Sequence, residues 1–256
     1  MFWKTDISDS LADNKKSMSV EDQQALKIMK ETAIQIDGHY QIALPCRKKT
    51  PCLPNNRQLA ESRIRLLKKR LLKNDQLCVK YVEAVKGYMT KGYVRKVPDD
   101  ELDPDGKPIW YILHHAVSNP HKPGKIRVVF DCTAKFKGTS LNDQLLHGPD
   151  LTYNLVSVLI RFRKEPIAFV ANIEAMFHQV FVSPNDRDVL SFLWCPNNDL
   201  TKESKDHQTQ VHIFGATSSP SCTSFCLKKT AQENRKLSRP SRRTFTSMIV
   251  WSRLNQ

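Results

Sequence analysis

Apolar residues recur along the first third of this chain at the spacing of amphipathic helices. The helix expected over residues 57–74 has its apolar face at Ala60, Ile64, Leu67 and Leu71. These positions lie three and four residues apart, so they form one stripe on an α-helix. A second helix is expected over 76–89, ending at Lys91-Gly92, because glycine commonly follows the last helical turn. A shorter helix over 19–31 and a strand after the Asp37-Gly38 turn are expected before them.

From residue 109 onward, short apolar runs alternate with turn residues. The strands that we expect here are 109–117, 126–131, 167–172, 179–182 and 210–214. The helices that we expect are 151–163, 186–192 and one from Pro220 to about Asn234. We expect 179–182 to be the return strand of 167–172. Strands that alternate with helices indicate the α/β or α+β class.

The chain is strongly basic, with 40 Lys and Arg against 26 Asp and Glu and a net charge of +14. Such an excess predicts a polyanionic partner, first nucleic acid and second an anionic membrane surface. The longest apolar run is five residues, far below the ~20 that span a bilayer. The first residues also lack the pattern of a secretory signal. We therefore expect an intracellular protein with no membrane segment.

Cysteine and glycine usage narrows the chemistry further. The seven cysteines are thinly spread and form no Cys-x2-Cys pair, so we expect reduced thiols that pack in the core. This pattern argues against a zinc site. The eight glycines form neither of the two common phosphate-binding patterns, which argues against a Rossmann or P-loop nucleotide site.

The positive charge is concentrated between residues 57 and 96, which hold 12 Lys and Arg against 3 Asp and Glu, a net +9. The candidate nucleic-acid-binding cations on the first helix are Arg63, Arg65, Lys69, Arg70 and Lys73. They form either a surface that follows a phosphate backbone or an ordinary solvated helix face. The size of the excess favours the first interpretation.

Three segments in the middle of the chain look like parts of one active site. They are Gly124-Lys-Ile-Arg-Val-Val-Phe-Asp131 with Lys137-Gly-Thr-Ser-Leu-Asn-Asp143, then Phe169-Val-Ala-Asn-Ile-Glu-Ala-Met-Phe-His-Gln-Val180, then Val211-His-Ile-Phe-Gly-Ala-Thr-Ser-Ser-Pro220. In order and spacing they resemble the reverse transcriptase of LTR retrotransposons, and most closely that of the Pao/BEL type. Leu53-Pro-Asn-Asn-Arg57 and Lys91-Gly-Tyr93 are similar to the segment before that polymerase, so the resemblance covers roughly residues 20–234.

The resemblance implies an RNA-directed DNA polymerase with the α+β fold of a right hand. Residues 109–234 would be its fingers and part of its palm, preceded by a basic, mainly helical segment over 21–108 and a disordered tail over 1–20. Its partners would be RNA and DNA as template and primer, and dNTP as substrate. In this family a primer 3′-hydroxyl attacks the α-phosphate of the dNTP. Two Mg²⁺ ions, held by three aspartates, stabilise the attacking and leaving oxygens.

The resemblance also implies roles for individual residues. Lys125 and Arg127 would hold the triphosphate, and Phe177 would press against the sugar and reject a 2′-hydroxyl. Gly215 would let the backbone pass close to the nucleotide, and the carbonyl of Ile173 would bind one metal ion. Ordinary alternatives stay open. The two cations could be charges on an edge strand, the phenylalanine a core residue and the glycine a simple bend.

Two departures from the family predict that the chain is catalytically inactive. Asn172 stands where the first catalytic aspartate is expected, and a neutral amide neither offsets the charge of Mg²⁺ nor bridges two such ions. The Tyr/Phe-x-Asp-Asp hairpin is missing, because no acidic residue follows Glu233. Two-metal binding is therefore expected to be lost. A sheet without this hairpin is expected to have an unpaired edge and an uncovered apolar face.

The end of the chain indicates how the hairpin was lost. Back-translation of Phe245-Thr-Ser-Met-Ile-Val-Trp251, read from the third base, allows Tyr-Val-Asp-Asp-Cys-Leu, and Met248-Ile249 forces the second aspartate. We infer a frameshift between about Asn234 and Phe245, which makes residues 235–256 foreign to the fold. The chain is then a decayed polymerase or, alternatively, a non-catalytic, sequence-tolerant nucleic-acid-binding protein. A basic structural protein of a ribonucleoprotein is a third alternative, against which the aligned motifs argue.

Overall fold

The two basic helices form where the apolar pattern predicts them. The computed structural model of the chain describes residues 18–102, 108–118, 126–153, 155–163, 170–237 and 249–250. Helix α2 spans Arg57–Leu72 and α3 spans Asp75–Thr90, and the four apolar residues of the predicted stripe on α2 are all buried. Between the helices, the Asn74 side chain accepts a 3.0 Å hydrogen bond from the Leu77 amide and so caps the start of α3. Gly92, at φ +71°, follows the end of α3.

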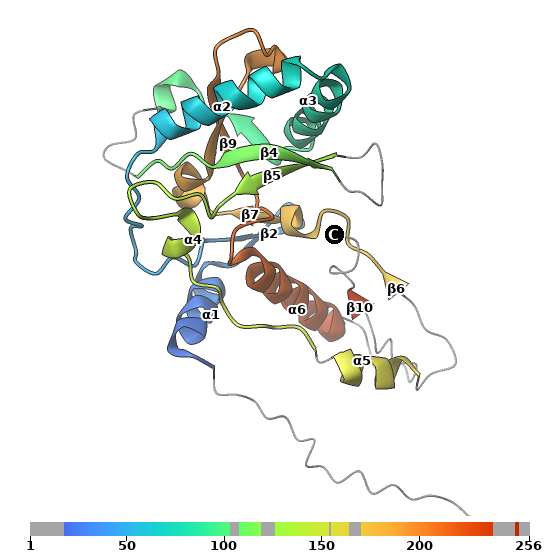
Figure 1. Cartoon of the computed structure of the whole chain (residues 1–256). Coiled ribbons are helices and arrows are strands. Elements are labelled where there is room, and N and C mark those ends of the chain that lie inside the picture. Colours follow the sequence, from blue (N-terminus) through green and yellow to red (C-terminus); the bar gives the residue numbers. More distant parts are fainter. Residues whose placement is uncertain are drawn as a thin grey trace, which may run out of the picture.

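The other described elements are short and form four small sheets (Figure 1). The remaining helices are α1 (Val20–Thr32), α4 (Leu141–Gln144), α5 (Leu155–Phe162) and α6 (Ser219–Leu237), with the 3₁₀ helices η2 (Asp99–Glu101), η3 (Met176–Gln179), η4 (Pro184–Leu190) and η5 (Pro196–Asn198). The strands are β1 (Ile34–Ile36), β2 (His39–Ile42), β3 (Val94–Lys96), β4 (Leu113–Ser118), β5 (Ile126–Asp131), β6 (Val170–Ala171), β7 (Val180–Val182), β8 (Ser191–Trp194), β9 (Lys205–Thr209) and β10 (Ile249–Val250). The fold is therefore mixed α+β, as predicted.

Strand pairing joins segments that are far apart in the sequence. β1 and β2 form a hairpin whose turn residues, Asp37 and Gly38, have φ of 49° and 80°, and β2 pairs in parallel with β7. A second sheet has the order β3-β9-β8 with antiparallel pairs. β4 and β5 form an antiparallel hairpin, in which Arg127 lies opposite Val117.

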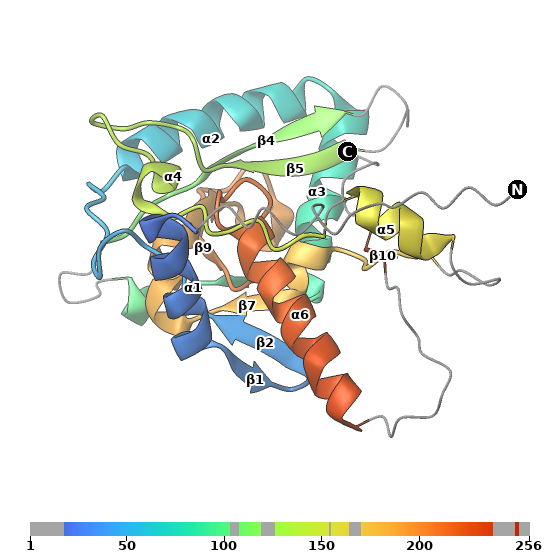
Figure 2. The ribbon, with the colours of Figure 1, turned by 90° about the horizontal axis from the view of Figure 1, so that it is seen from below.

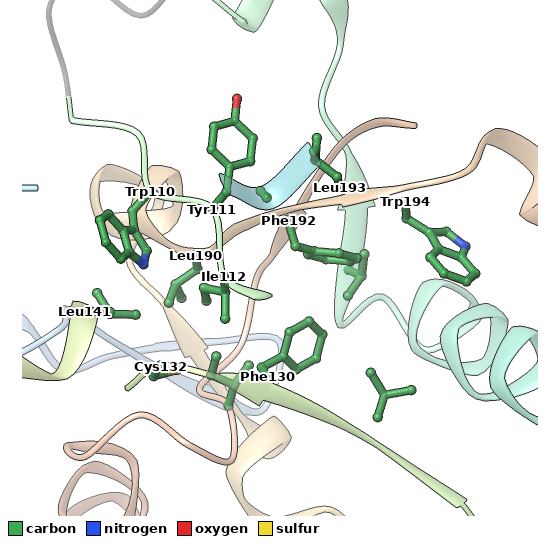
Figure 3. Packing of buried hydrophobic residues seen from close by; sticks show 14 of the residues in the cluster. Trp110, Tyr111, Ile112, Phe130, Cys132, Leu141, Leu190, Phe192, Leu193 and Trp194 are labelled. Carbon is green, nitrogen blue, oxygen red and sulfur yellow. The ribbon is translucent and has the colours of Figure 1, made fainter. Parts of the chain in front are cut away.

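Apolar side chains gather in two cores. The larger core lies between α2, α3 and the strands β4, β5 and β8, and Figure 3 shows Phe130 and Phe192 pointing toward each other within it. Their rings are 5.2 Å apart, in an edge-to-face arrangement. The second core includes Met29 of α1, Ile42 of β2 and Cys222 of α6. In this part α1 and α6 lie on the same side of β2 and β7 (Figures 1 and 2).

The strand predicted over residues 210–214 is wrong, because the strand, β9, ends at Thr209. Four of the five residues of β9 are buried, and their side chains are polar. In a sequence, a run of polar residues such as Asp206–Thr209 does not predict a buried strand. Asp206 is buried because Arg57 pairs with its carboxylate at 2.8 Å and the Tyr111 hydroxyl donates to it at 2.7 Å.

The pairing expected for residues 179–182 is also wrong. β7 pairs with β2 instead of returning along β6, because the chain turns away after β6 through Ala175, at φ +48°, and through η3. β6, which the structure describes only at 170–171, pairs in parallel with β10. The palm sheet was expected to have an unpaired strand edge, and at residues 170–171 one edge of β6 is instead paired with β10. The part of the predicted foreign tail at 238–248 and 251–256 lies outside the described residues, as do residues 1–17.

Two further segments differ from the prediction. Residues 109–112 precede β4 and make only an isolated parallel bridge, between Tyr111 and Ser191, while the Asn56 side chain pairs with the other edge of Tyr111. This side chain accepts a 2.7 Å hydrogen bond from the Tyr111 amide and donates one of 2.8 Å to the Tyr111 carbonyl. Residues 186–192 divide between η4 and the buried strand β8 instead of forming one helix.

Helix α5 is shorter than predicted and leaves apolar side chains in water. Leu155, Val156, Leu159 and Ile160 have exposed fractions between 49% and 65%. Their spacing places them on one face of the helix, so the described residues leave this apolar face uncovered. Within the described ranges, no helix has both the length and the apolar character needed to cross a membrane.

Candidate functional site

The structure brings together the three segments that the sequence singled out. Strand β5 lies beside the loop that carries Gly215, and that loop contacts the segment after β6 through Phe177 and Phe214. The rings of these phenylalanines are 5.6 Å apart at an interplanar angle of 43°. The backbone continues the contact, because the His212 amide donates a 2.9 Å hydrogen bond to the carbonyl of Val180. Residues separated by more than 80 positions therefore form one site.

Gly215 is the closest point between the first and third segments. Its φ of +118° lies in a region that other residues rarely adopt, and a Cβ there would overlap the Phe130 carbonyl oxygen. The Asn142 side chain fixes the loop, because its Nδ2 donates to the Gly215 carbonyl and its Oδ1 accepts from the Thr217 amide, each at 2.9 Å. The close approach that requires glycine is thus to the chain's own strand β5.

Asn172 follows β6 directly and is exposed to solvent. Its side chain makes no hydrogen bond to another described residue, and the neighbouring Ile173 is half-buried. An amide and a backbone carbonyl are neutral donors, so this pair does not fit two Mg²⁺ ions. In the part of the chain that the structure describes, no three His, Cys, Asp or Glu side chains gather as a metal site.

The two acidic residues nearest to this segment in the motifs already have partners. Asp131 accepts hydrogen bonds from the Thr133 amide and hydroxyl, at 3.0 and 2.6 Å, and so forms a turn after β5. Glu174 forms an ion pair with Lys91 at 2.9 Å. This pair lowers the pKa of Glu174 and raises the pKa of Lys91. Asp131 therefore takes part in a turn and Glu174 in an exposed ion pair.

His178 attaches the segment after β6 to the end of α3, a role that the sequence did not reveal. Its ring lies 5.4 Å from the ring of Tyr88 and 4.8 Å from that of Tyr93. Burial lowers the pKa of His178 to about 4, and the positive charge of Lys91 acts in the same direction. The similarity of Lys91-Gly-Tyr93 to the family was the available signal, because these residues form the other half of the contact.

Of the two cations expected to hold a triphosphate, only Arg127 lies within the described residues, and Lys125 lies outside them. The Arg127 side chain is exposed on β5. Burial raises the pKa of the Tyr88 hydroxyl, and the positive charges of Arg127 and Lys91 oppose this rise. Arg127 thus lies on the same strand as Phe130, against whose carbonyl Gly215 packs.

The basic face of α2 consists of the five exposed cations Arg63, Arg65, Lys69, Arg70 and Lys73. None of them forms an ion pair with another described residue. Arg57 and Arg95, by contrast, bind Asp206 and Glu101 within the fold. The opposite face of α2 packs on β4 and β8, and both views show the β4–β5 hairpin between α2 and β7 (Figures 1 and 2). The structure therefore does not bring the basic face of α2 together with Asn172.

Comparison of the sequence with known protein families and curated proteins identifies no family for this chain. No protein-family model matches the sequence, and no curated protein matches it either. The chemistry available to the chain follows from its own residues, which are the neutral Asn172 after β6, the aromatic pair Phe177 and Phe214, and a basic helix face.

Proposed function

We propose that this chain is a non-catalytic, sequence-tolerant nucleic-acid-binding protein that descends from the RNA-directed DNA polymerase of an LTR retrotransposon. The basic face of α2 is the observation that carries the binding proposal. Five exposed cations on one helix, without acidic partners among the described residues, attract a polyanion without reading its sequence. The net charge of +14 acts in the same direction at longer range.

The descent is supported by the order of the three motifs and by their contacts. Gly215 packs against Phe130, Asn142 binds the same loop, and Phe177 meets Phe214. Segments that once formed one polymerase site are expected to keep such contacts, because the fold around them still needs a core. In this proposal the hairpin β4–β5 corresponds to the fingers of a right-hand polymerase, and α6 with the segment after β6 corresponds to part of its palm.

Loss of catalysis is supported by the donor set at the end of β6. Nucleotidyl transfer through two metal ions needs several carboxylates, since two divalent cations at ~4 Å repel each other. Asn172 and the carbonyl of Ile173 supply no negative charge. Asp131 and Glu174 are engaged elsewhere, in a turn and in an ion pair with Lys91.

The binding proposal is tested with the salt dependence of affinity. Fluorescence anisotropy with labelled single-stranded RNA and DNA of unrelated sequences should give similar affinities that fall steeply between 50 and 200 mM salt, by about 0.7–0.9 in the logarithmic slope for each phosphate contact. The variant Arg63→Gln/Arg70→Gln should bind more weakly and reduce the slope by about 1–2. A control with the same charge change on α1, Lys27→Gln/Lys30→Gln, should leave the slope nearly unchanged. An affinity that does not respond to salt would exclude the proposed binding mode.

A further inference from the structure

We propose that Phe177 and Phe214 form a stacking platform for the unpaired bases of single-stranded nucleic acid. This inference rests on the proposed function, because it names the form of nucleic acid that the chain binds and the side chains that contact its bases. It also assigns a role to Phe214, for which the motifs supplied none.

Phe214 is exposed although the residues directly before it are buried. Its exposed fraction is 48%, whereas His212 and Ile213 before it are 1% exposed and Ala216 after it is 4% exposed. Phe214 does not stand alone, because its ring meets that of Phe177, and two adjoining rings offer an aromatic surface on which a base can stack. Phe177 completes the surface, with its ring 5.6 Å away and tilted by 43°.

The platform is fixed before any ligand arrives. Gly215, next to Phe214, packs against the Phe130 carbonyl and is bound by the Asn142 side chain at 2.9 Å. Next to Phe177, the His178 ring packs against the rings of both Tyr88 and Tyr93. Both rings thus extend from anchored backbone, and little conformational entropy remains to be lost on binding.

The size and surroundings of the pair favour a nucleobase over a protein partner. A stable protein interface buries about 800 Å² on each side, far more than two rings supply, whereas a base stacks on a single aromatic ring. Arg127 is exposed on β5, the strand against which Gly215 packs, and its charge suits the adjoining phosphates. Bases within a duplex are already stacked on each other, so only unpaired bases present a free face.

The test uses the full chain and oligodeoxynucleotides that carry 2-aminopurine, whose fluorescence falls when it stacks. We expect the wild-type protein to quench this probe, and Phe214→Leu and Phe177→Leu to abolish the quenching. Leucine keeps an apolar side chain but has no π-face. The affinity of Phe214→Leu should fall at least about fivefold with an unchanged salt slope, because the phosphate contacts remain. A matched control, Tyr153→Leu, removes an aromatic ring that is 63% exposed beside Lys228 and should change neither quenching nor affinity.

Two results separate this inference from the proposed function. If the wild-type chain binds with steep salt dependence but Phe214→Leu quenches and binds equally well, the platform is wrong and the binding proposal stands. If the wild-type chain binds no oligonucleotide, both fail. An oligonucleotide with abasic sites keeps the phosphates and removes the bases, so wild-type protein should bind it at least about fivefold more weakly than the intact strand. Equal affinity for the two strands would refute the platform without the use of any variant.

Discussion

Protonation of His212 should make the fold sensitive to mild acid. The side chain is 1% exposed, and its ring nitrogens have little beyond a weak contact with the Ile42 backbone, which opposes the effect of burial on the pKa. Burial lowers its pKa to about 4 from the ordinary value of 6.5. Between these two values the unfolded chain binds the proton and the folded chain does not. The stability that neutral His212 contributes is therefore present above pH 6.5 and is lost as the pH falls toward 4.

The size of this loss follows from the two pKa values. A difference of one pKa unit corresponds to about 1.4 kcal/mol, so the full loss approaches about 3 kcal/mol below pH 4, and about 2 kcal/mol is already lost at pH 5. A domain of ordinary stability unfolds with about 5–15 kcal/mol, so one histidine accounts for a large part of the margin. Burial also lowers the pKa values of His114 and His178 to about 4, which adds to the effect in the whole chain.

The variant His212→Leu separates this residue from the other histidines. At pH 7 we expect its stability to equal or exceed that of the wild type, because leucine fills the site without burying two polar atoms that have little hydrogen bonding. Between pH 7 and pH 5 it should lose about 2 kcal/mol less than the wild type. Urea unfolding at both pH values measures the difference, with Trp110 and Trp194 as core fluorophores that are 1% and 0% exposed. Equal losses in the two proteins would show that His212 is not the group that takes up the proton.

The remaining predictions concern the contact of Gly215 with Phe130 and the uncharged residue Asn172. Gly215→Ala should destabilise the fold by about 2–3 kcal/mol, since its φ of +118° and the Phe130 carbonyl leave no room for a Cβ. Its control, Gly87→Ala within α3, meets no atom within 4 Å and should stabilise by about 0.5–1 kcal/mol, so thermal melts of both variants should shift in opposite directions. Asn172→Asp should remain inactive in primer extension on an RNA template with Mg²⁺ or Mn²⁺, because one carboxylate does not assemble a two-metal site. Incorporation of dNTP by the unmodified chain above a heat-killed control would contradict the loss of catalysis.

The parts of the fold that could be predicted from the sequence are those in which the spacing of neighbouring residues shows which side chains are buried. The stripe on α2 repeats at helical spacing, and all four of its residues are buried. The turn at Asp37-Gly38 has the chemistry that a two-residue hairpin requires. β9 could not be predicted, because its burial depends on distant partners. Asp206 is buried with Arg57, 149 positions away, and with Tyr111, 95 positions away, as its partners, and no local pattern in the sequence shows these pairings.

The residues of the candidate site also fall into two groups, those that the sequence identifies and those that only the structure identifies. Phe177, Asn172 and Gly215 could be named from the sequence because residue type and motif order single them out, and their functional roles stay predictions. Phe214 and His178 were missed, since their roles depend on contacts between separate segments, which are a ring 5.6 Å away in one case and the rings of Tyr88 and Tyr93 in the other. The residues of a motif can be recognised in a single sequence, whereas the residues that pack against the motif can be recognised only in the structure.

The arrangement of the two candidate binding surfaces leads to one further consequence. The basic cations are exposed on α2, which packs on β4 and β8, whereas Phe177 of the aromatic pair belongs to η3. Substitutions on α2 should therefore change the salt slope and leave base stacking intact, and substitutions at the aromatic pair should do the reverse. If the two sets of variants instead changed both quantities together, the chain would bind nucleic acid through one continuous surface. Additive effects on the binding free energy are the signature of two separate contacts, because sites without shared partners combine independently.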